Sequence, residues 1–114
     1  MRDVSDPVAI ARVRWLDLGR HPAPGSTMGA TAVFVLGNDA EVIPGWPAMG
    51  KHFSVLLTFT DALTGTGEAE AKVDFLDREA VANYLREGAT LLIMAGPQPI
   101  AEAQITTLLW KPDP

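Results

Sequence analysis

Glu68–Phe75 reads E-A-E-A-K-V-D-F, and small or apolar side chains alternate with charged ones along its whole length. Successive side chains of a β-strand point to opposite faces, so one face of this segment is apolar and the other is charged. The pattern therefore predicts a strand that packs on one face and meets water on the other.

Segments on both sides of this stretch carry similar signals. Further strands are predicted at residues 8–15, 30–36, 52–60, 89–95 and 100–110, which are rich in alternating or β-branched side chains. A short additional strand is expected at residues 41–43. Glycine and proline break the chain between these segments, notably at residues 17–29 and at the tight turn 96–99.

One helix is expected, near residues 77–87. Asp77 can accept the free amides of a first turn, and Gly88 can end the helix. Four apolar side chains recur at helical spacing between them, namely Ala80, Val81, Tyr84 and Leu85.

These elements predict a mainly β fold, a small six- or seven-stranded antiparallel barrel with one inserted helix near residues 77–87. The 114 residues are 47% hydrophobic and contain no linker, so we expect a single domain over 1–114 with an ordered core at about 8–110. An open sheet with the helix packed across one face is the alternative, because barrel closure leaves no mark in sequence.

Composition excludes several classes of function. Nine basic against 14 acidic residues give a net charge of −5, which argues against binding to nucleic-acid backbones. The absence of cysteine removes disulfides and thiolate chemistry. The longest purely apolar runs are far shorter than the ~20 residues of a membrane-spanning helix. No secretory signal pattern is visible at the N-terminus, so we expect a cytoplasmic protein with no membrane association.

No catalytic, metal or cofactor motif is recognisable. The glycines are not spaced as a phosphate-binding loop, and His21 and His52 lie far apart without carboxylates at metal-ligand spacing. We therefore predict no enzyme activity, no metal and no cofactor. The acidic side chains Glu68, Glu70 and Asp74 share one strand face with Lys72, as expected for a hydrated outer face.

The three tryptophans differ in their sequence context. Trp15 and Trp110 fall in predicted strands and are expected in the core. Trp46 lies between Pro44 and Pro47 on a stiff loop, a position suited either to a partner-facing anchor or to a plug that closes the loop.

The order of segments resembles the C-terminal β-barrel domain of elongation factor Tu and related translation GTPases. In that domain a first strand leads into a G-G-R-H-T-P loop, and here residues 8–18 lead into L-G-R-H-P at 18–22. A later family strand corresponds to residues 50–59, and its final hairpin corresponds to residues 91–105. The resemblance extends over about residues 8–110.

The resemblance implies a barrel used as a docking surface, with an interface role for Gly19, Arg20 and His21. The family's arginine and glycines that approach transfer RNA are replaced here by Gln98, Pro99, Ala101 and Ala103. Transfer-RNA binding is therefore not carried over, and neither is GTP hydrolysis, because no GTPase domain is present.

Two hypotheses follow. The first is a noncatalytic, bacterial-type protein-binding module with candidate interface residues Gly19, Arg20, His21 and Trp46, in one form an immunity or inhibitor protein that covers a basic site. The alternative is a small-ligand-binding protein or enzyme whose site combines His21, His52 and nearby charged residues. A homodimer is a further option for the first hypothesis.

Overall fold

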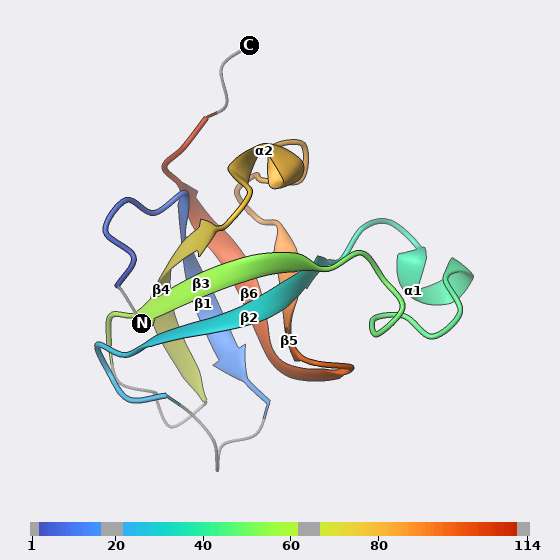
Figure 1. Ribbon diagram of the computed structural model, residues 1–114, viewed down its shortest axis with the longest axis horizontal. Coiled ribbons are helices and arrows are strands. Elements are labelled where there is room, and N and C mark those ends of the chain that lie inside the picture. Colours follow the sequence, from blue (N-terminus) through green and yellow to red (C-terminus); the bar gives the residue numbers. More distant parts are fainter. Residues whose placement is uncertain (1–2, 17–21, 62–66, 112–114) are drawn as a thin grey trace.

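Six antiparallel strands close into a barrel in the computed structural model, which describes residues 3–16, 22–61 and 67–111 (Figure 1). Around the barrel the strands follow the order β1-β4-β3-β2-β5-β6. They are β1 (Ala9–Trp15), β2 (Thr27–Phe34), β3 (Phe53–Phe59), β4 (Glu68–Phe75), β5 (Thr90–Ala95) and β6 (Gln98–Leu108). The predicted mainly β barrel is confirmed, and the open-sheet alternative is wrong because β1 pairs with both β4 and β6.

Most strand positions agree with the sequence, and β4 has the bounds that its alternation predicts. β2 begins at Thr27 rather than Ala30, because pairing with β3 draws three more residues of the preceding loop into the sheet. The turn between β5 and β6 is shorter than expected, since Ala95 already pairs with Gln98 and leaves only Gly96 and Pro97 between them.

The helical predictions need correction. The helix expected near residues 77–87 is the single turn α2 (Arg78–Val81). Asp77 caps it as predicted, accepting from the Ala80 N–H at 3.2 Å. The helix ends early because Val81 and Leu85 are buried against the barrel, and the chain returns to the sheet, where the Gly88 N–H donates to Ile105.

The expected strand at residues 41–43 is also wrong. Residues 41 and 42 belong to a second short helix, α1 (Asp39–Val42). The Val42 N–H donates to the Asn38 carbonyl and the Ile43 N–H to the Asp39 carbonyl. These local hydrogen bonds satisfy the backbone without a partner strand, so a helical turn is sufficient here.

Small and large side chains are segregated in the barrel interior. The inward positions of β1, β4 and β6 include six buried alanines: Ala9, Ala11, Ala69, Ala71, Ala101 and Ala103. Most of the bulk comes from the opposite strands, through Phe34, Leu57, Phe59, Leu91 and Ile93. A six-stranded barrel has little internal volume, so the alanines leave the space that the larger side chains fill.

Replacing a central alanine therefore overfills the barrel. Ala71 is fully buried and pairs with Ala11 of β1. We expect Ala71→Leu to lower the free energy of unfolding by about 1–3 kcal/mol in urea titrations. The control Ala80→Leu, on the exposed side of α2, should unfold near the wild-type midpoint. Equal midpoints for the two variants would contradict the packing argument.

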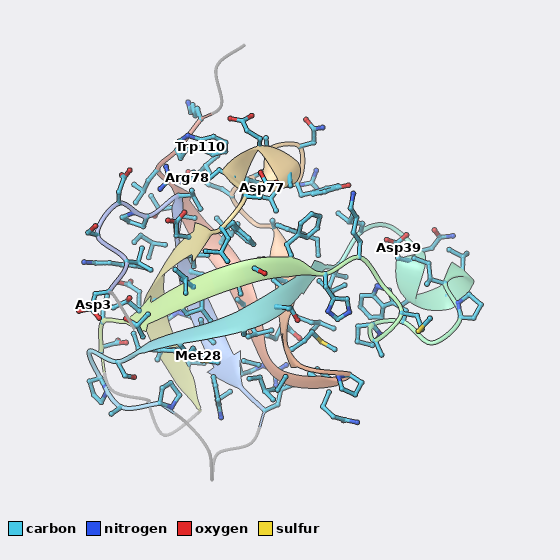
Figure 2. The ribbon with its side chains drawn as sticks, in the orientation of Figure 1. Asp3, Met28, Asp39, Asp77, Arg78 and Trp110 are labelled. Carbon is cyan, nitrogen blue, oxygen red and sulfur yellow. The ribbon has the colours of Figure 1, made fainter. Side chains whose placement is uncertain are left out.

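Arg78 closes one end of the barrel. Its Nε donates to Asp74 Oδ1 at 3.0 Å, and a terminal nitrogen donates to the Asp6 backbone carbonyl. The guanidinium lies 5.9 Å from the centre of the Trp110 ring, and both side chains gather beside α2 in Figure 2. The hydrogen bond to Asp74 is the main cause that raises the Arg78 pKa.

The expected core position of Trp110 is wrong. Trp110 lies beyond the end of β6 and is only half-buried.

Removal of this side chain should loosen both ends of the chain. We expect Arg78→Ala to reduce the free energy of unfolding by about 1–2 kcal/mol, since it loses hydrogen bonds and ring packing together. Arg14→Ala is the control, because its contact with Glu102 is a surface ion pair worth less than about 1 kcal/mol. Similar losses in chemical denaturation of the two variants would contradict a special role for Arg78.

Candidate functional site

Residues 35–52, here called the lobe, connect β2 to β3 and project from the side of the barrel (Figure 1). Consecutive tight turns build the lobe. The Trp46 N–H donates to Ile43, the Met49 N–H to Gly45 and the Gly50 N–H to Pro47. The prolines and glycines of the segment prevent a longer helix or a strand, and these local hydrogen bonds give it a defined shape instead.

Trp46 lies where the lobe meets the barrel. A Cβ added to Gly50 would lie 3.1 Å from Trp46 Cδ1 and 3.2 Å from Val33 Cγ1, so the lobe backbone packs closely on both side chains. Val33 does not belong to the cluster of buried side chains inside the barrel, yet it is only 2% exposed because the lobe covers it. Trp46 is therefore half-buried at the base of the lobe, and only part of its indole is accessible to a partner.

His52 ties the lobe to β2. Its Nε2 lies 3.2 Å from the Pro47 carbonyl and 3.0 Å from the Ala48 carbonyl, and its Nδ1 lies 3.1 Å from Thr31 Oγ1. Carbonyl oxygens only accept hydrogen bonds, so Nε2 carries a proton and donates to them, while Nδ1 shares a hydrogen bond with the threonine hydroxyl. Both ring nitrogens are thus occupied in a structural contact, which leaves neither free to act as a base or a metal ligand.

A small pocket of about 60 Å³ lies between the lobe and the barrel. Aromatic side chains form much of its wall, namely Phe34, Trp46, Phe53 and Tyr84. Asp39 and Lys51 also line it, and the Lys51 ammonium lies 5.4 Å from the centre of the Phe53 ring. The volume is about that of two water molecules, so the pocket has room for the tip of one side chain.

Three of the six large hydrophobic side chains that are exposed among the described residues lie on the lobe. Val42 is 58% exposed and Met49 is 73% exposed, and Val35 at the start of the lobe is also exposed. The sequence analysis did not single out Val42 or Met49. The available signal was two apolar side chains in a segment rich in proline and glycine, where regular structure is too short to bury them.

Other predicted site residues take different positions. Gly19, Arg20 and His21 lie outside the described residues. Two acids of the β4 outer face contact arginines, Glu68 with Arg12 at 3.9 Å and Asp74 with Arg78. Within the described part of the chain, no group of three or more His, Cys, Asp or Glu side chains is placed to hold a metal ion.

Comparisons with protein-family models, with curated proteins and with solved structures found no match for this chain. Over the described residues, no helix has the length and apolar character needed to cross a membrane.

Loss of the His52 contacts should release the lobe. In His52→Ala we expect the amide hydrogens of Met49 and Gly50 to exchange with solvent at least about tenfold faster. Opening of the lobe then no longer requires the His52 hydrogen bonds to break, so it costs less free energy. Hydrogen exchange followed by NMR measures this directly. Thr106→Ala is the matched control, since it removes a side-chain bond to the Ile10 carbonyl far along the chain. Unchanged lobe amides in His52→Ala would contradict the assigned role.

Proposed function

We propose that this protein is a noncatalytic protein-binding module that docks a partner through the lobe. The observation that carries the proposal is the exposure of Val42 and Met49 on a segment that His52 holds against the barrel. Exposed apolar side chains on a fixed support favour association, because their burial is favourable and little conformational freedom is lost.

The aromatic pocket supports the same use of the lobe. An apolar side chain of the partner that enters beside Trp46 would contact Phe53 and Tyr84. Central buried anchors of this kind usually account for most of the affinity of a protein interface. Methionine adapts to irregular partner surfaces because its side chain is unbranched.

Charge favours a basic partner. The chain has a net charge of −5, and Asp39 and Glu41 lie on the lobe itself. An acidic surface speeds encounter with a basic one and makes the complex sensitive to salt. An immunity or inhibitor protein that covers a basic site in the cytoplasm is the specific form of this proposal. The resemblance to the elongation factor Tu barrel, which implies a docking surface, agrees with it.

The test compares three tagged baits in affinity capture from the source cells, read by mass spectrometry at low and moderate salt. They are the wild type, Met49→Lys and Leu76→Lys. Met49 and Leu76 are 73% and 72% exposed, but Leu76 lies at the start of the α2 connection rather than on the lobe, so it is a matched control. We expect a protein that the wild type and Leu76→Lys retain, and that Met49→Lys loses.

Retention of every captured protein by Met49→Lys would reject the lobe as the docking surface. Recovery of the bait alone at both salt concentrations would reject protein docking and favour the small-ligand alternative. A basic partner that dissociates as salt rises would support the inhibitor form, and a salt-insensitive partner would reject that form.

A further inference from the structure

The barrel is incompletely paired along the first half of β2. This strand pairs with β3 from Thr27 to Ala32, but it pairs with β5 only from Thr31 to Phe34. β5 ends at Ala95, and the Gly96-Pro97 turn then carries the chain into β6. Within the described parts of the chain, residues 27–30 therefore have a neighbouring strand on one side only.

The strand register shows which backbone N–H and C=O groups of β2 have no partner on β5. The Val35 N–H donates to the Thr90 carbonyl, and pairing continues to Thr31 opposite Met94. Alternate residues of an antiparallel strand direct their N–H and C=O groups to the same edge. Thr27 and Gly29 thus present their backbone groups to the edge that β5 does not reach.

A hollow of about 360 Å³ lies along this edge. Met28 and its neighbours on β2 form one side, where Figure 2 marks Met28, and Met94, Gly96 and Ile100 of the hairpin form the other. Gly29 and Gly96 have no side chain, so another backbone can approach the strand. A hollow beside unpaired backbone groups offers the hydrogen-bonding pattern that an added strand needs.

The lining defines the chemistry of the occupant. Among the described residues that line the hollow there is no Asp, Glu, Lys or Arg, and His52 is the only ionisable one. The Met28, Met94 and Ile100 side chains are apolar, so an uncharged segment with apolar side chains at alternate positions fits best. The backbone groups of Thr27 and Gly29 would supply its main-chain hydrogen bonds.

The shape of the site disfavours a second copy of the chain. In a two-fold dimer the same edge of both copies would have to meet, but each edge is recessed between β2 and its own β5–β6 hairpin. Two hollows of this form cannot fill one another. A separate extended segment can enter between β2 and the hairpin.

We propose that the β2 edge at residues 27–30 binds an extended, uncharged segment of a partner protein, which adds to the sheet as a strand. This mode of recognition takes its affinity from main-chain hydrogen bonds and its specificity from alternate side chains. The proposal goes beyond lobe docking, because it uses other residues and shares only Thr31 and His52 as a border. Its test does not depend on Met49, which belongs to the lobe.

The Thr27 end of the edge is already held in place. The Thr27 hydroxyl donates to Asp3 Oδ1 at 2.7 Å and lies 2.7 Å from Thr58 Oγ1, which also accepts from the Val4 N–H at 2.8 Å. These contacts order the outer face of β2 and β3, so the free edge needs little rearrangement before it binds a segment.

The experiment uses the full chain and a phage-displayed library of random linear peptides. An enriched peptide is synthesised in its natural form and in two N-methylated forms. One form carries N-methyl groups at the odd-numbered residues and the other at the even-numbered residues. We expect binding of the natural peptide to slow amide exchange at Thr27 and Gly29 in NMR spectra. One N-methylated set should bind at least about tenfold more weakly, because it loses main-chain donors, and the other should bind like the parent.

Two variants test the edge itself. Gly29→Pro removes the N–H that faces the hollow and should weaken peptide binding at least about tenfold, whereas Gly29→Ala keeps that N–H and should bind like the wild type. Folding of each variant is checked by its NMR spectrum, and the N-methylated peptides decide the matter if Gly29→Pro does not fold. Met49→Lys should bind the peptide normally, which separates this proposal from lobe docking.

The proposal is overturned if the library yields no peptide that protects the Gly29 amide. It is also overturned if both N-methylated sets bind like the parent, since recognition would then not use the main chain. Protection of Gly29 by self-association at rising protein concentration, measured by light scattering, would assign the edge to a second copy and reject a separate partner segment.

Discussion

The restricted volume of a six-stranded barrel is the constraint on which the rest of this structure depends. The closed sheet leaves room for only a few large side chains, so β1, β4 and β6 present mainly alanine near the middle of the interior. Aromatic side chains then occupy the two ends. Trp15 and Phe59 pack edge to face with centroids 6.1 Å apart, and Phe34 lies 5.9 Å from Phe75. The lobe and the open edge of β2 both lie outside this packed interior.

β2 connects the interior to both candidate surfaces. Its even-numbered residues, including Phe34, face inward, whereas Val33 and Thr31 face outward beneath the lobe. The same strand loses its β5 partner below Thr31, which opens the hollow at Gly29. β2 pairs with β3 over Thr27–Ala32 and with β5 only over Thr31–Phe34, so the support of the lobe and the open edge belong to one strand.

His52 lies at the junction of these two surfaces. It binds Thr31 on β2 and the carbonyls of Pro47 and Ala48 in the lobe, and it also borders the hollow beside Gly29. A histidine with both nitrogens occupied in this way positions the backbone around it, so its role is architectural in either mode of binding. The lobe and the edge are held by the same side chain although they present different chemistry.

Local sequence patterns predicted the six barrel strands and the helix cap, although they placed the start of β2 too late and added a strand at residues 41–43 that does not form. Alternation along β4, the turn at Gly96 and the cap at Asp77 depend on residues close together in the chain, which is why local patterns predict them. Trp46 could be singled out from its flanking prolines, but not its half-buried position on Val33. The tertiary structure alone decided the short α2, the His52 contacts and the open β2 edge. Each of these features depends on where segments far apart in the sequence meet and on where a neighbouring strand ends. No local pattern of side chains encodes those contacts.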